Sequence, residues 1–245
     1  MNPEKTIWVA LDTNKTKAIK IAEKLSRHPA VYGFKVNRLL DEEVFRKNGE
    51  PALFDILHDT GKYVWVDGKF HDIPRTVVGR IAPYVESGKV QFLTIMAKGE
   101  VDMMMDAVSA TRGIADIIAV TELTSGTEEQ IDLGSGHSSK ASVINLARNA
   151  VISRVLYLVC SSQELEVIGK RRELASLELF IPGITPAWKN NAPSDQNRIG
   201  TPAFVLDPKR CNNKKKLVIG SAIIEADDPW EAVEKTAAEI EDLKA

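Results

Sequence analysis

The chain has 245 residues, with 32 lysines and arginines against 34 aspartates and glutamates, so its formal net charge is −2. This balance argues against a nucleic-acid-binding protein, because gripping a phosphate backbone needs a clear basic excess. Hydrophobic residues make up 44% and charged residues 27%, which is typical of a globular protein rather than a disordered chain. No apolar run approaches the roughly 18 residues that span a bilayer, so we expect no membrane partner.

The N-terminal segment and the number of cysteines indicate in which cellular compartment the protein is expected. The opening segment, MNPEKTIWVALD, runs almost directly into a strand-like stretch and leaves no room for a signal peptide. The sequence contains two cysteines, Cys160 and Cys211, which is too few for a disulfide framework. Disulfide-poor proteins are typical of reducing compartments, so we expect a cytoplasmic protein.

Short apolar runs alternate with amphipathic stretches along the chain. The pattern predicts strands over residues 6–11, 31–36, 63–66, 90–96, 115–120, 155–160, 177–181 and 217–219. It predicts helices over 15–27, in pieces within 38–60, and over 73–87, 101–111, 139–152, 162–175 and 229–243. We expect a polar loop after the fifth strand, and a solvated turn at the lysine run 214–216.

Eight strands separated by helices, at about 30 residues per unit, predict an α/β protein with a (β/α)₈ TIM barrel. The sequence shows no interdomain linker or low-complexity tract, so we expect residues 1–245 to form a single domain. The strands are nearly continuous apolar runs, as in sheets that are covered on both faces. An open doubly wound sheet is the alternative, but no glycine-rich dinucleotide fingerprint follows the first strand.

Charged residues stand at the ends of the first three predicted strands. Asp12 ends the first, Lys35 lies in the second, Asp67 ends the third and Lys69 follows two residues later. Active sites of such barrels lie at the carboxyl ends of the strands, and residues two apart on an extended segment point the same way. Buried charges are costly unless paired, so we expect an alternating network of ammonium and carboxylate groups at the barrel mouth.

Seven motifs in this order resemble the orotidine 5′-phosphate decarboxylase family. They are ALD at 10–12, YGFKV at 32–36, DGKFHDIPRT at 67–76, VTELTS at 120–125, PGITP at 182–186, DQNRIGTP at 195–202 and VIG at 218–220. The resemblance implies a cofactor-independent decarboxylation of orotidine 5′-monophosphate to UMP. It implies that Lys69 protonates the carbon that loses CO₂, with Asp67 beside the departing carboxylate. Lys35 would hold Asp67 and contact the ribose, and Asp12 would hydrogen-bond the ribose.

The same resemblance implies the remaining contacts. Asp72 and Thr76 would reach into the neighbouring subunit's site, so that the active form would be a homodimer. Thr124 would contact the pyrimidine. The phosphate would be held by Gln196 and by the chain at Gly220 and Ser221. No metal is expected, because the four histidines show no ligand spacing.

The chemistry of this decarboxylation explains why a lysine would lie next to the reacting carbon. The carbanion left at carbon 6 of orotate is poorly delocalised, and no cofactor is expected to act as an electron sink. A fixed cation in a dry site can stabilise that charge as it forms, and a lysine can then supply the proton.

Three residues depart from the family pattern. Ser221 and Thr185 stand where phosphate-binding arginines are usual, and Gly68 replaces an apolar residue. Losing arginine weakens the phosphate grip, because a charge-assisted contact is roughly twice as strong as a neutral one. We expect another cation to compensate, and the candidates are Lys189, Arg198 and Arg210. The long segment 185–202 suits a lid that closes over substrate.

Two alternatives remain open. Sugar-phosphate enzymes of the same superfamily, 3-keto-L-gulonate 6-phosphate decarboxylase and hexulose-phosphate synthase, share D-x-K-x-x-D but use magnesium. Their metal is held partly by an acidic residue on the second strand, where this chain has Lys35. The second alternative is a nucleotide-binding protein with reduced activity, which only Ser221 and Thr185 favour.

Overall fold

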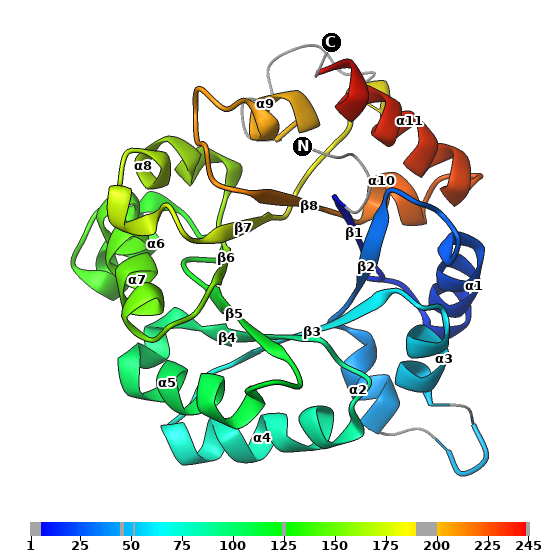
Figure 1. Ribbon diagram of the computed structural model, residues 1–245, viewed down its shortest axis with the longest axis horizontal. Helices are drawn as coiled ribbons and strands as arrows, with labels where there is room; N and C mark the ends of the chain where they lie inside the picture. The colour runs from blue at the N-terminus through cyan, green and yellow to red at the C-terminus, as the bar shows by residue number, and fades with distance from the viewer. Residues whose placement is uncertain (1–5, 45–46, 51, 124–125, 190–199, 244–245) are drawn as a thin grey trace.

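The computed structural model describes the chain except residues 1–5, 45–46, 51, 124–125, 190–199 and 244–245. Eight parallel strands pair in chain order, and β8 pairs with β1, which closes the barrel (Figure 1). The strands are β1 Ile7–Ala10, β2 Val31–Val36, β3 Tyr63–Phe70, β4 Phe92–Met96, β5 Asp116–Val120, β6 Tyr157–Val159, β7 Glu178–Ile181 and β8 Lys215–Ile219. The predicted (β/α)₈ fold is confirmed.

Helices surround this barrel. They are α1 Lys15–Leu25, α2 Leu39–Val44, α3 Leu53–Asp59, α4 Pro74–Ser87, α5 Glu100–Thr111, α6 Glu128–Ser135, α7 Ser139–Ile152, α8 Leu165–Gly169, α9 Pro202–Leu206, α10 Ser221–Ile224 and α11 Pro229–Asp242. Local signals set their ends: the Asn14 side chain caps α1, and Pro74 occupies the first turn of α4, where no N–H is needed.

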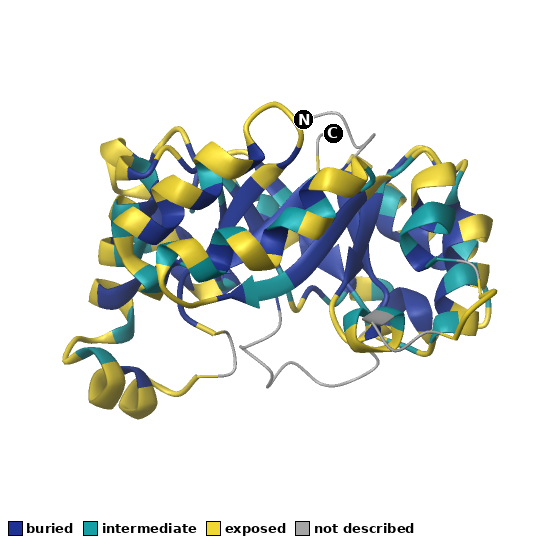
Figure 2. Cartoon of the chain, turned by 90° about the horizontal axis from the view of Figure 1, so that it is seen from below, coloured by how far each residue is buried: buried dark blue, intermediate teal, exposed yellow. Residues whose placement is uncertain are grey.

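Two apolar layers position the site. The larger layer lies between the strands and the helices, whose outward faces are exposed (Figure 2). The smaller one fills the barrel interior around Trp8, Trp65, Phe92 and Phe180. The Trp8 ring lies 5.4 Å from that of Trp65, edge to face, and such aromatic contacts make a rigid floor. The centre of the barrel is therefore filled by side chains, and a ligand site can lie only at its open end.

The predicted helix over 162–175 is wrong as a single element. The segment forms α8 between two short 3₁₀ turns, η2 Ser162–Glu164 and η3 Arg172–Leu174. Gly169 packs so closely on the backbone of residues 210 and 211 that an added Cβ would lie 2.7 Å from a carbonyl oxygen. This tertiary contact overrides the helical periodicity.

Two further expectations are corrected. Lys215 and Lys216 belong to β8 and are not a solvated turn; Lys215 is buried, and its ammonium donates to the carbonyl of Cys211. The loop expected after the fifth strand contains α6. That helix begins with a capping box, in which Thr127 and Gln130 satisfy each other's backbone N–H groups.

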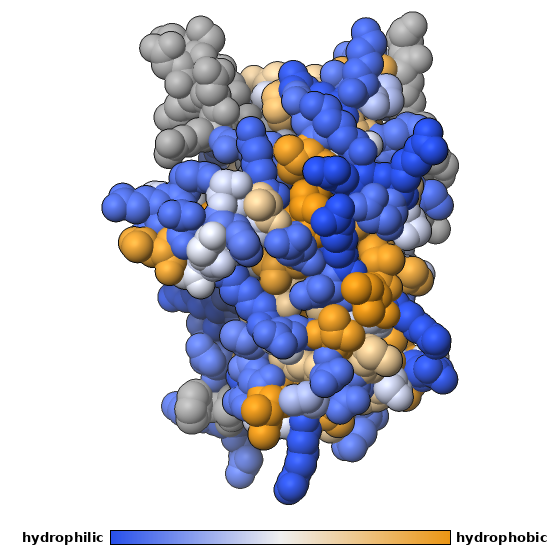
Figure 3. Space-filling model, turned by 90° about the vertical axis from the view of Figure 1, so that its left-hand side faces the viewer, coloured by the Kyte–Doolittle hydropathy of each residue, from blue (hydrophilic) through white to orange (hydrophobic). Residues whose placement is uncertain are grey.

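The outer surface is mainly hydrophilic on the side that carries α6, α7 and α8, with hydrophobic side chains scattered over it (Figure 3). Among the described residues, no helix is both long and apolar enough to cross a membrane.

Candidate active site

A cavity of about 520 Å³ opens at the carboxyl ends of the strands. Residues from seven of the eight strands, or from the turns that follow them, form its wall, and Trp65 of the aromatic layer contributes to it. The lining residues are Ala10, Asp12, Lys35, Trp65, Asp67, Lys69, Val120, Glu122, Leu123, Val159, Pro182, Gly183, Ile184, Thr185, Val218, Gly220 and Ser221. The cavity combines an apolar wall with few polar groups, as ligand sites commonly do.

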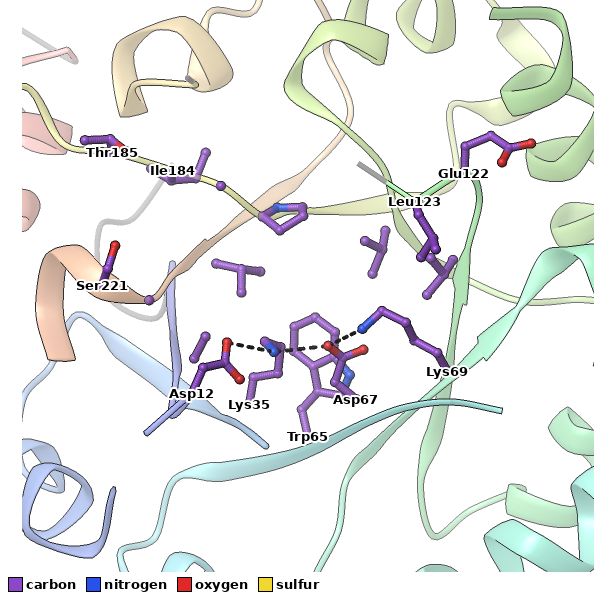
Figure 4. A pocket seen from close by; sticks show the side chains of 17 residues that line it. Asp12, Lys35, Trp65, Asp67, Lys69, Glu122, Leu123, Ile184, Thr185 and Ser221 are labelled. Atoms are coloured by element: carbon purple, nitrogen blue, oxygen red, sulfur yellow. Dashed lines mark hydrogen bonds and ion pairs between the residues drawn. The ribbon is translucent and has the colours of Figure 1, made fainter. Parts of the chain in front are cut away.

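Four charged side chains stand in a row on one wall (Figure 4). The ammonium of Lys35 lies 3.5 Å from Oδ2 of Asp12 and 3.1 Å from Oδ2 of Asp67. The ammonium of Lys69 donates to the same Asp67 oxygen over 2.7 Å. The expected alternating network is therefore present, in the order Asp12, Lys35, Asp67, Lys69.

Burial differs along this row. Lys35 and Asp67 are buried, whereas 34% of the Lys69 side chain and 47% of the Asp12 side chain are exposed. The buried inner pair is therefore held in place, whereas the two outer side chains keep surface free for contact with a ligand in the cavity.

The segment that carries Asp67 and Lys69 departs from a regular strand. β3 pairs with β4 at Val66 and again at Phe70, with a shift of register between them, and Lys69 has a φ of 44°. Gly68 fits this bend because a Cβ there would lie 2.5 Å from the ring of Phe70. The glycine that departs from the family pattern is thus explained by close packing against a ring two residues on.

The pKa of Asp67 reflects two opposed effects. Burial alone would raise it, but the ammonium groups of Lys35 and Lys69 outweigh burial and hold the pKa below its ordinary value. The carboxylate therefore stays ionised at neutral pH, and each neighbouring lysine keeps an anionic partner.

This lowered pKa predicts a pH-dependent contribution to stability. The contribution is complete above the unfolded-state pKa of about 3.9 and is lost as the pH falls from there through the lower folded-state pKa. We expect the free energy of unfolding of the unsubstituted protein to exceed that of Asp67→Asn at pH 7. The difference should shrink steadily below about pH 4. Denaturant titrations at several pH values measure it, and a difference that stays constant down to pH 2 would contradict the lowered pKa.

Away from Lys69 the lining includes Thr185, Gly220 and Ser221, none of which carries a charge. Figure 4 shows Thr185 and Ser221 on the side of the cavity opposite Lys69, on which Asp12 also lies. Two of the cations expected to compensate for the missing arginines are elsewhere. Lys189 lines a separate surface hollow with Asp227 and other acidic residues, and Arg210 pairs with Glu166 over 2.6 Å. Neither side chain lines the cavity, so a phosphate contact from Lys189 or Arg210 stays a prediction. The third, Arg198, lies outside the described residues.

The other expected site residues divide into two groups. Asp72 and Thr76 do not line the cavity; Asp72 is exposed and its carboxylate accepts the N–H of Ile73. Thr124 and Gln196 lie outside the described residues, so their expected contacts stay predictions.

Sequence reasoning missed several groups that support the site. The buried carboxylate of Glu122 is held by the ammonium of Lys98 at 2.7 Å and by the hydroxyl of Ser142 at 2.6 Å, and it points away from the cavity centre (Figure 4). The amide of Asn37 donates to the backbone carbonyl of Asp67 over 2.6 Å. Glu122 lies inside the motif at 120–125, but the resemblance gave it no role, and Asn37 lies outside the quoted motifs. Only an acidic residue at the end of a buried strand was available as a signal for Glu122.

Fold and site together define the class: a (β/α)₈ barrel whose mouth holds alternating lysines and carboxylates beside a cavity for a small ligand. The family model described as "Orotidine 5'-phosphate decarboxylase / HUMPS family" matches residues 5–236. The chain belongs to this family.

Named relatives agree with this membership. The chain is 34% identical to orotidine 5′-phosphate decarboxylase of Methylacidiphilum infernorum, over 95% of this chain and 96% of the relative. It is 35% identical to the enzyme of that name from Alcanivorax borkumensis, over 93% and 94%. The crystal structure of orotidine 5′-phosphate decarboxylase from Lactobacillus acidophilus superimposes with a TM-score of 0.73 at 26% identity, covering 97% of this chain and 99% of that one.

Proposed function

We propose that this protein decarboxylates orotidine 5′-monophosphate to UMP without a cofactor, in pyrimidine biosynthesis. The observation that carries the proposal is the row Asp12–Lys35–Asp67–Lys69 on the cavity wall, with both lysine ammonium groups on one oxygen of a buried carboxylate. Full-length relatives that bear the name of this enzyme support it.

Lys69 is the proposed proton donor and carbanion stabiliser. Its ammonium lies at one of the two exposed ends of the row, on a half-buried side chain that borders the cavity. A positive charge held there before the reaction begins stabilises negative charge as CO₂ leaves and needs little reorganisation. The same ammonium can then protonate the carbon.

Asp67 and Lys35 orient this donor. Asp67 is ionised and buried, so it holds both ammonium groups in a fixed arrangement. The substrate carboxylate would lie beside Asp67, and the ribose beside Asp12 and Lys35. The uncharged residues Thr185, Gly220 and Ser221 would receive the phosphate, since Thr185 and Ser221 lie across the cavity from Lys69 (Figure 4).

A homodimer completes the proposed site. Asp72 and Thr76 follow the carboxyl end of β3 on either side of Ile73, which is 65% exposed, yet neither lines the cavity of its own chain. Residues placed in this way can serve a neighbouring subunit across a two-fold axis. We further propose a cytoplasmic location, and a single domain over residues 1–245.

The sugar-phosphate alternative has less support. Its magnesium would need an acidic group on the second strand, and β2 instead presents Lys35, whose ammonium already contacts two carboxylates. A cation at that position would repel a metal ion.

The loss of orotidine 5′-monophosphate absorbance, followed in the presence and absence of EDTA, tests the proposed function. We expect equal rates of UMP formation in both cases. Binding of UMP without any turnover of the substrate would instead support a nucleotide-binding protein, and activity abolished by EDTA would support the metal-dependent alternative.

Ser221→Arg tests the proposed phosphate site. Adding a cation there should lower the KM for orotidine 5′-monophosphate roughly tenfold, because the new contact with the phosphate is charge-assisted. Steady-state kinetics measure it, and Ser221→Gln is the control for a long side chain without charge. An unchanged KM in Ser221→Arg would show that the phosphate is bound elsewhere.

A further inference from the structure

Thr94 is a fully buried hydroxyl in the otherwise apolar strand β4. Its Oγ1 accepts the backbone N–H of Lys69 over 3.0 Å and lies 2.9 Å from Oδ1 of Asp67, to which it donates. The carbonyl of Val66 is a second acceptor, at the longer distance of 3.4 Å. One side chain therefore touches both residues at the centre of the proposed chemistry.

The pairing of the strands explains why this position matters. Val66 pairs with Leu93 and Phe70 with Ile95, so Asp67, Gly68 and Lys69 all lie opposite Thr94 alone. The extra residues form a bulge, a local feature that re-aims side chains next to active sites. Regular pairing cannot satisfy the Lys69 N–H at this point, and the Thr94 hydroxyl does so instead.

The backbone of Lys69 needs such support. Its φ of 44° is in the left-handed region, which a residue with a Cβ rarely adopts unless surrounding contacts impose it. The hydrogen bond from its N–H to Thr94 is a contact of that kind.

Thr94 also determines which oxygen of Asp67 the lysines use. Both ammonium groups contact Oδ2, at 3.1 Å from Lys35 and 2.7 Å from Lys69, while Oδ1 accepts from Thr94. A carboxylate held in this way cannot rotate about its χ2 without breaking three hydrogen bonds. Its orientation in turn fixes the Lys69 ammonium.

We infer that Thr94 is a positioning residue for the decarboxylation, acting through Asp67 and Lys69 and not by contact with substrate. The inference rests on the proposed function of the same site. A positioning role predicts different effects on kcat and on binding. A Lys69 ammonium misplaced by about 1 Å should lower kcat strongly, whereas UMP, which lacks the departing carboxylate, should bind as before.

Thr94→Val and Thr94→Ser test this inference in the full-length protein. Valine keeps the shape and removes the hydroxyl, so we expect kcat to fall roughly tenfold to a hundredfold, with the Kd for UMP changed less than about threefold. Serine retains the hydroxyl and should keep kcat within about threefold of the unsubstituted protein. Thr111→Val, which removes a buried hydroxyl on α5 away from the cavity, is the matched control and should leave kcat unchanged.

Several outcomes would overturn the inference. One is a Thr94→Val variant with normal kcat, and another is a Thr94→Ser variant as slow as Thr94→Val. If thermal melting shows that Thr94→Val is unfolded, Thr94→Cys replaces it as the test variant, because a thiol is readily buried but is a weak hydrogen-bond donor. A folded Thr94→Cys with normal kcat would refute the positioning role. Failure of the unsubstituted protein to form UMP would refute the proposed function instead, so the two failures are distinguishable.

Discussion

Replacing Lys69 with alanine should lower kcat roughly 10⁴-fold, because the change removes the group proposed both to donate the proton and to stabilise the carbanion. The Lys69 ammonium is the outermost positive charge of the row and the one with free surface towards the cavity. Binding of UMP should be retained, since the group is needed in the transition state more than in the ground state. Single-turnover kinetics and UMP titration measure the two effects separately.

Lys235→Ala is the control for that substitution. Lys235 pairs with Glu231 on the surface of α11, and its loss should leave kcat unchanged. A Lys69→Ala variant that turns over within tenfold of the unsubstituted protein would show that another group delivers the proton.

Mixed dimers should recover activity from two inactive parents. We expect Lys69→Ala and Asp72→Ala each to be inactive, and a heterodimer purified through two different tags to have about half the turnover of the unsubstituted dimer. In that heterodimer, the subunit with Asp72→Ala retains its own Lys69 and receives an intact Asp72 from its partner. The reason is structural: Asp72 is exposed just after the carboxyl end of β3 and does not line the cavity of its own chain.

The control for the mixed dimer pairs Lys69→Ala with Lys35→Ala. Both residues line the cavity of their own chain, so neither subunit can complete a site for the other. This heterodimer should stay inactive. Recovery in the control, or no recovery with Asp72→Ala, would contradict a site shared across the dimer.

The charged row could be predicted from sequence because barrel geometry brings strand ends together. Asp12, Lys35 and Asp67 are far apart along the chain, but each comes at the end of an apolar run, and consecutive strands of a barrel are neighbours. Their pairing followed from the cost of burying an isolated charge. The confirmed arrangement therefore needed only strand order and electrostatics.

Thr94 could not be predicted in the same way. It is a single hydroxyl in the run FLTIM, 25 residues from its partner Lys69, and its role depends on a shift of register between two strands. A pattern of period two cannot reveal such a shift, because residues of the bulge no longer alternate in step with those of the neighbouring strand.

Lys189 and Arg210 show a related limit. Both are cations on segments near the expected phosphate end, but Arg210 pairs with Glu166 and Lys189 lines a separate surface hollow. Proximity in sequence could not reveal these partners, because they come from other elements of the fold.

A crystal structure with UMP bound is the most direct test of whether the lysine–carboxylate row takes the place of a cofactor. We predict that the Lys69 ammonium lies roughly 3 Å from carbon 6 of the pyrimidine, within proton-transfer reach, with Asp67 between Lys35 and Lys69. A structure in which these three side chains are splayed apart, or in which the pyrimidine lies away from Lys69, would contradict the account.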